Sequence, residues 1–173
     1  MAHTDQATNS PPSTHELLTT YLRDHRAGAA AGLALVRRCR SSNEGTELDD
    51  VLSRIETEII QETQALELIM SRFAITPSEL KIAAAKVGEV VGRLKTNGRL
   101  FTYSPSSRVL ELELLASAVM TKRSLWRSLK TVVGSHPELV ASELDALEAM
   151  ATAQYEMLMQ EHGKAAAAAF SKD

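Results

Sequence analysis

The segment LDDVLSRIETEIIQETQALELIMSRF, residues 48–73, decides the fold class. Its apolar side chains recur every three or four residues, the spacing that lines one face of an α-helix. These positions are Leu48, Leu52, Ile55, Ile59, Leu66, Ile69 and Phe73. The segment predicts an amphipathic helix of about seven turns. Such a helix buries its apolar face against other helices.

Four further helices are expected on either side of this segment. Ser13-Thr14-His15-Glu16 fits a capping box at the start of a first helix. Thr76-Pro77-Ser78-Glu79 combines a capping threonine, a proline at the first helical position and a glutamate at the third. Asn97-Gly98 suits a left-handed helix end. The expected helices span about residues 14–40, 47–73, 77–97, 106–134 and 135–162, the last ending at Gly163.

Short connections constrain how these helices pack. Linkers of about two to eight residues place successive helices side by side and antiparallel. The predicted fold is therefore all-α, an antiparallel up-down bundle with a four-helix core and a fifth C-terminal helix. Residues 14–163 are expected to form one domain, with a disordered N-terminal tail over 1–13 and a short C-terminal tail over 164–173.

The amino-acid composition argues against some kinds of binding partner. A chain of 173 residues suits a single domain. Its net charge of −3 gives no bulk attraction to nucleic acid. A single cysteine forms no internal disulfide and requires no oxidising compartment. No apolar run reaches the length of a membrane span. We therefore expect a cytoplasmic protein without nucleic-acid or membrane partners.

Four polar residues interrupt the apolar faces of the expected helices. His25, Glu62, Glu89 and Glu113 come from four different helices, and the antiparallel register places them at one depth. Carboxylates and imidazole that project into a bundle build ferritin-like di-iron sites, and these ligands suit iron or manganese. The alternative is a hydrogen-bonded structural network. The chain has no Glu-x-x-His motif, which such metal sites normally contain.

The run Ala27-Gly28-Ala29-Ala30-Ala31-Gly32 gives the first helix a smooth face. Each glycine inside a helix costs about 1 kcal/mol relative to alanine, so the two glycines need an explanation. One interpretation is close approach of a neighbouring helix. The other is space for a ligand next to His25.

Basic residues gather where the first and third helices end and the fourth begins. A candidate anion site there consists of Arg93, Lys95, Arg99, Ser104 and Arg108. Free backbone N–H groups at a helix start can hold an anion. The alternative is that cations at helix C-termini offset the helix dipole.

Several short segments resemble a known family over about residues 15–132. They are Tyr21-Leu22-Arg23-Asp24-His25, Ala27-Gly28, Gly92-Arg93-Leu94-Lys95-Thr96-Asn97-Gly98, Tyr103-Ser104-Pro105, Glu111-Leu112-Glu113 and Leu125-Trp126. They are similar to segments of a small bacterial family of ferritin-like helical-bundle proteins. The resemblance implies a helical bundle and gives no established substrate. The wider ferritin-like class implies a di-iron site.

The expected function follows from the lack of a strong catalytic motif. We expect a non-enzymatic bundle without a cofactor that acts through protein–protein contacts, as a homodimer or with a bacterial partner. The alternative is a degenerate ferritin-like metalloprotein that binds iron or manganese at His25, Glu62, Glu89 and Glu113.

Overall fold

The computed structural model describes residues 11–76 and 104–171. These residues form four long helices, with no strand among them. The helices are α1 (Thr14–Ser41), α2 (Glu47–Arg72), α4 (Pro105–Thr131) and α5 (Ala141–Phe170), and a short 3₁₀ helix, η1 (Val133–Ser135), follows α4. The all-α prediction is confirmed. The helix expected over 77–97 lies outside the described residues.

Side-chain caps fix two of the helix starts. At α1 the Ser13 hydroxyl accepts a hydrogen bond from the Glu16 backbone N–H (3.2 Å), and the Glu16 carboxylate accepts one from the Ser13 N–H (2.7 Å). The predicted capping box is confirmed. At α4 the Ser104 hydroxyl accepts from the Ser107 N–H (3.2 Å), and Pro105 takes the first helical position.

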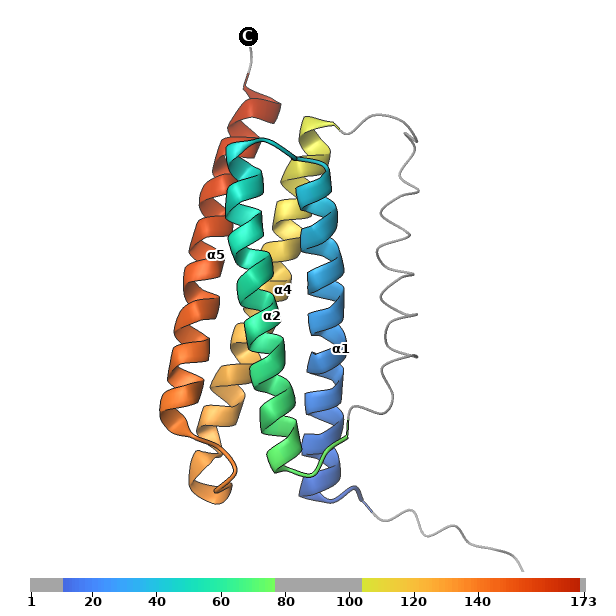
Figure 1. Cartoon of the computed structure of the whole chain (residues 1–173), viewed down its shortest axis with the longest axis vertical. Coiled ribbons are helices and arrows are strands. Elements are labelled where there is room, and N and C mark those ends of the chain that lie inside the picture. Colours follow the sequence, from blue (N-terminus) through green and yellow to red (C-terminus); the bar gives the residue numbers. More distant parts are fainter. Residues whose placement is uncertain (1–10, 77–103, 172–173) are drawn as a thin grey trace, which may run out of the picture.

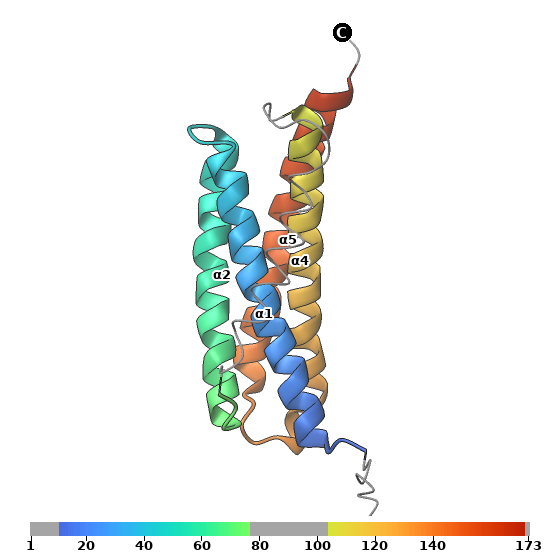
Figure 2. The same cartoon turned by 90° about the vertical axis from the view of Figure 1, so that its right-hand side faces the viewer.

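The four helices form an antiparallel bundle. The helix α1 packs against α2 and α4, and α5 packs against α4 and α2. Figure 1 shows that neighbouring helices run in opposite directions. Figure 2 shows the pair α1–α2 beside the pair α4–α5. The predicted up-down arrangement therefore holds for these four helices.

The core lies where the apolar faces of all four helices meet. Every helix contributes a leucine with no solvent exposure. These residues are Leu22 on α1, Leu52 on α2, Leu115 on α4, and Leu144 and Leu158 on α5. Trp126 on α4 is also buried in this core, with about 1% of its surface exposed. Burial of this kind is the main source of stability of the bundle.

The C-terminal helix α5 is one of these core helices. It contributes Leu144, Leu147, Ala151, Leu158 and Ala165 to the hydrophobic core. The sequence-based expectation instead treats this helix as an addition to a core that four other helices close. The difference arises because periodicity shows that a face is apolar, without showing what covers it.

Both ends of α5 differ from their predicted positions. The helix begins at Ala141, because residues before it form a turn in which the Leu139 N–H donates to the His136 carbonyl (3.1 Å). It ends at Phe170, so the predicted end at Gly163 is wrong. A glycine costs a helix about 1 kcal/mol, and the alanine-rich sequence that follows strongly favours continuation. An ion pair between Lys164 and Glu161 (2.7 Å) spans the glycine.

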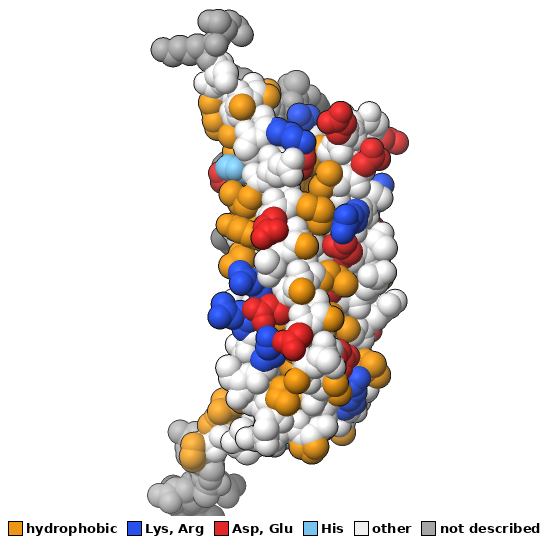
Figure 3. Space-filling view, turned by 90° about the vertical axis from the view of Figure 1, so that its left-hand side faces the viewer, with side chains coloured by type: hydrophobic (Ala, Val, Ile, Leu, Met, Phe, Trp, Pro, Cys, Tyr) orange, Lys and Arg blue, Asp and Glu red, His pale blue; other side chains and the backbone are white. Residues whose placement is uncertain are grey.

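The surface carries charges of both signs. On the face shown in Figure 3, acidic and basic side chains lie interspersed. Lys130 on α4, for example, contacts Asp145 (2.5 Å) and Glu148 (3.0 Å) on α5. Within residues 11–76 and 104–171, no helix has both the length and the apolar character needed to cross a membrane.

Candidate functional site

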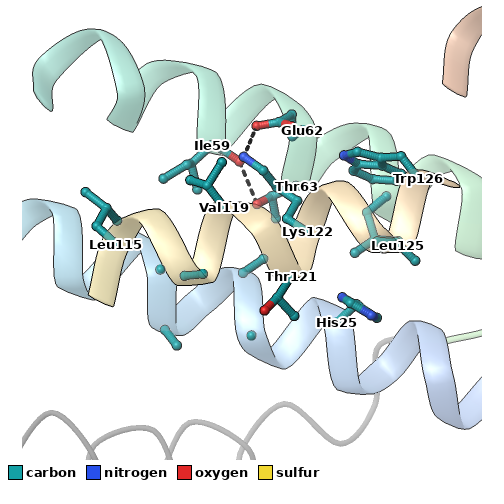
Figure 4. Close-up of a pocket in the computed structure, with 16 residues that line it drawn as sticks. His25, Ile59, Glu62, Thr63, Leu115, Val119, Thr121, Lys122, Leu125 and Trp126 are labelled. Atoms are coloured by element: carbon teal, nitrogen blue, oxygen red, sulfur yellow. Dashed lines mark hydrogen bonds and ion pairs between the residues drawn. The ribbon is translucent and has the colours of Figure 1, made fainter. Parts of the chain in front are cut away.

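A pocket of about 290 Å³ lies between α1, α2 and α4 (Figure 4). Its walls are mainly apolar, with a small number of polar groups, which is the usual composition of small-molecule sites. The apolar side chains on its wall are Ile59, Leu66, Leu115, Val119, Leu125 and Trp126. The polar ones are His25, Glu62, Thr63, Thr121 and Lys122.

Small residues of α1 form one side of the pocket. Gly28, Ala29, Ala31 and Gly32 all line it. A methyl group built on Gly28 or Gly32 meets no atom of the described residues within 4 Å. The described helices therefore make no close contact at these glycines, and the interpretation of this run as a close-packing face is not supported there. The alternative interpretation, space beside His25, agrees with the pocket.

A buried polar network closes the pocket on the side of α2, α4 and α5. Lys122 on α4 donates to the Glu62 carboxylate on α2 and to the Gln154 side-chain carbonyl on α5 (2.5 Å). The Gln154 amide donates in turn to Glu62 (2.9 Å) and Glu58 (3.0 Å). The network therefore ties three helices together at one level of the bundle.

Burial and the neighbouring carboxylates act in opposite directions on the Lys122 ammonium. Burial lowers the pKa of the Lys122 ammonium from its ordinary value, because removal from water disfavours the charged form. The carboxylates of Glu62 and, more weakly, Glu58 oppose that effect. The two carboxylates therefore offset part of the cost of burying the ammonium group.

Two buried polar atoms of residues that line the pocket have no hydrogen-bond partner among the described residues. One is Oε1 of Glu62, whose other oxygen accepts from Lys122 and Gln154. The other is Nε1 of Trp126. Both side chains are about 1% exposed. Most buried polar groups in proteins are paired, so these two atoms are exceptions among the described residues.

His25 borders the pocket from α1. Its ring contacts the edge of the Tyr21 ring at a centroid separation of 4.6 Å. Burial lowers the pKa of the His25 imidazole, and the nearby Asp24 partly opposes that shift. The neutral imidazole is therefore favoured near neutral pH, and it adds a polar but uncharged group to the pocket wall.

The structure does not bring the four candidate metal ligands together in one described site. His25 and Glu62 line the same pocket, in agreement with their predicted common level. Glu62, however, pairs with Lys122. Glu113 lies on the surface, and Glu89 is outside the described residues. Among residues 11–76 and 104–171, no group of three or more histidine, cysteine, aspartate or glutamate side chains is positioned to hold a metal ion.

Glu113 does not occupy the apolar face, so that part of the prediction is wrong. Its side chain is 51% exposed and contacts His162 on α5 (3.0 Å). The buried carboxylate on this turn belongs to Glu111, which pairs with Arg38 on α1 (3.0 Å). The buried stripe of α4 passes through Leu112 and Leu115, and Glu113 points about 100° away from Leu112 because each helical residue turns by that angle.

Only two of the five candidate anion-binding residues are described. The Ser104 hydroxyl caps α4. Arg108 is half-buried in the first turn of that helix. Arg93, Lys95 and Arg99 lie outside the described residues. The cations at the end of α1 contact carboxylates: Arg40, for example, contacts Asp49 (2.9 Å) and Glu56 (2.7 Å).

Sequence reasoning missed Lys122 and Gln154 as site residues. Lys122 is one of several cations in the second half of α4, where an effect on the helix dipole is the simplest interpretation. The helical spacing gave one indication that Lys122 lies on the buried face of α4. Lys122 is three residues after Val119 and four before Trp126, and both of these are buried. Gln154 similarly lies between Ala151 and Leu158.

No protein-family model matches the sequence, and no curated protein or solved structure matches it significantly. The resemblance to ferritin-like bacterial proteins therefore stays a prediction. The pocket between α1, α2 and α4 is the candidate site that the described residues offer.

Proposed function

We propose that this chain is a binding protein for a compact, largely apolar small molecule, held in the pocket between α1, α2 and α4. The observation that supports this most is the pocket itself. It combines open space beside two glycines, apolar walls from three helices, and a few polar groups from the same helices. Larger polar ligands such as nucleotides are disfavoured by these walls.

The volume sets the size of the molecule. An engineered apolar cavity of about 150 Å³ binds benzene, which has six heavy atoms, so about 290 Å³ suits a molecule of about twelve heavy atoms. Butylbenzene is a suitable probe because it is apolar and close to this size. Trp126 is the only tryptophan of the chain and lies in the pocket wall, so its fluorescence reports on occupancy of this site.

Gly32→Leu is expected to weaken butylbenzene binding at least tenfold, because the new side chain grows into the pocket that Gly32 lines. Titration of both proteins with butylbenzene, followed by Trp126 emission and by the melting temperature, measures this effect. A ligand that binds only the folded state stabilises it by RT ln(1 + [L]/Kd), so the melting temperature rises with the concentration of free ligand.

Gly163→Leu is the matched control for this substitution. Gly163 is also a helical glycine with open space around it, on the exposed side of α5. It is expected to leave butylbenzene binding unchanged. The proposal fails if wild-type protein binds no probe of this size, or if Gly32→Leu and Gly163→Leu bind equally well.

The functions expected from the sequence stay predictions. Iron or manganese binding at His25 and Glu62 receives no support from the geometry, because Lys122 and Gln154 already contact the same oxygen of Glu62. Homodimer formation and contact with a bacterial partner have no specific observation in their favour among the described residues.

A further inference from the structure

The pocket between α1, α2 and α4 has an exposed edge and a buried interior. Two of its lining residues, Gly28 on α1 and Thr121 on α4, are exposed. Gly32, Leu115 and Val119 also line the pocket, and all three are buried. A molecule therefore reaches the pocket along the edge that Gly28 and Thr121 form, and this edge is the mouth of the pocket.

The register of α1 and α4 places the two mouth residues opposite each other. Arg38 on α1 pairs with Glu111 on α4 (3.0 Å), and the two helices run in opposite directions (Figure 1). Gly28 lies ten residues before Arg38, and Thr121 lies ten residues after Glu111. Both helices rise by the same amount per residue, so Gly28 and Thr121 lie at the same level. A methyl group built on Gly28 meets no atom of the described residues within 4 Å, so space is open there.

His25 and Thr121 bring polar groups to this edge of the pocket. The Thr121 hydroxyl donates its one hydrogen to the Ser117 carbonyl (3.0 Å), so its oxygen faces a ligand as an acceptor. His25 lies one turn before Gly28 on α1, and its ring nitrogens make no hydrogen bond within residues 11–76 and 104–171. The imidazole is half-buried, and its nitrogens are not among the fully buried unpaired atoms. Figure 4 shows both side chains between α1 and α4.

The interior is less favourable to a polar group than the mouth. Its charged side chains, Glu62 and Lys122, already pair with each other. The other oxygen of Glu62 and Nε1 of Trp126 are fully buried, so a molecule in the pocket does not reach them. The interior walls are mainly apolar, and a polar group placed against them loses its hydration without compensation. A ligand with one polar end is therefore bound best with that end at the mouth.

We infer that the ligand is amphiphilic and lies across the pocket, with its apolar end in the interior and its polar end at the mouth. The apolar end packs against Gly32, Leu115 and Val119. The polar end is a hydrogen-bond donor, such as a hydroxyl group, and it donates to the hydroxyl oxygen of Thr121. This inference rests on the proposed function, because it names the ligand class and its orientation in the same pocket.

Nuclear Overhauser contacts between the full chain and 4-phenylbutan-1-ol test the orientation. This probe is butylbenzene with a hydroxyl group at the end of its alkyl chain. We expect contacts from its CH2OH protons to the Thr121 methyl group, and from its phenyl protons to the methyl groups of Leu115 and Val119. The opposite pattern, with the phenyl ring at Thr121 and the CH2OH group at Leu115, overturns the inference.

The variant Thr121→Val tests the hydrogen bond, because it keeps the shape of the side chain and removes the hydroxyl. The affinity ratio of 4-phenylbutan-1-ol to butylbenzene, measured by calorimetry, is expected to fall by about threefold. Thr57→Val is the matched control and is expected to leave the ratio unchanged. Thr57 on α2 is exposed, donates in the same way to the Ser53 carbonyl (3.0 Å), and does not line the pocket.

The outcomes distinguish the inference from the proposed function. The ratio compares two probes in one protein, so a general change in pocket shape affects both, and retained butylbenzene binding shows that the variant is folded. An equal ratio in wild type and Thr121→Val overturns the inference and leaves the apolar binding function intact. Failure of both probes to bind the wild-type protein overturns the inference and the proposed function together.

Discussion

Lys122→Met is expected to lower the free energy of unfolding by about 3–5 kcal/mol, the usual cost of removing one partner of a buried ion pair. Glu62 is about 1% exposed, and the substitution leaves its carboxylate with Gln154 as its remaining hydrogen-bond donor. Urea unfolding at neutral pH measures the change. The methionine itself has a volume similar to that of lysine, so little of the effect comes from packing.

A double variant shows whether the loss of stability in Lys122→Met comes from the unpaired Glu62 charge or from lost packing contacts. Glu62→Met combined with Lys122→Met removes both charges, and it is expected to recover much of the stability lost in Lys122→Met. Lys130→Met serves as the surface control, because Lys130 pairs with Asp145 and Glu148 at the exposed edge of the same helix. Equal losses in the single and double variants would contradict the account of this network.

Leu158→Ala is expected to destabilise the protein by about 2–5 kcal/mol, the range for deleting a fully buried leucine side chain. Leu158 lies on α5 and has no solvent exposure. The loss in free energy of unfolding measures how much the packing of α5 in the core contributes to stability. Denaturant unfolding followed by circular dichroism gives the value.

Met159 provides the control at the neighbouring position. Its side chain is 39% exposed on the same helix, so Met159→Ala changes helix propensity and length of side chain without opening a core cavity. It is expected to change stability by less than about 0.5 kcal/mol. A loss for Leu158→Ala no larger than that for Met159→Ala would show that α5 covers the bundle from outside.

The start of α1 and the whole of α2 could be predicted from the sequence. The capping box at Ser13 and Glu16 is a local signal, and so is the three/four spacing from Leu48 to Phe73. The end of α5 could not be predicted from Gly163, because a glycine weakens a helix by an amount that a following alanine run offsets.

The candidate site was only partly predictable. The phase of α1 and α2 brings His25 and Glu62 to one pocket, as the register predicts. The sequence pattern did not identify Lys122 as a site residue, because a long side chain places its charge several ångströms from its own backbone. The glycines at 28 and 32 suit either close helix contact or open space, and only the tertiary arrangement distinguishes these.

The most direct test of the central claim is a methyl NMR titration of the full chain with butylbenzene. We predict saturable shifts at methyl groups that line the pocket and much smaller ones at Leu17 and Leu68, which are exposed elsewhere. The pocket reporters are Ala29, Ala31, Leu66, Leu115, Val119 and Leu125. Shifts confined to the exposed leucines, or none at any concentration that dissolves, would contradict a ligand site between α1, α2 and α4.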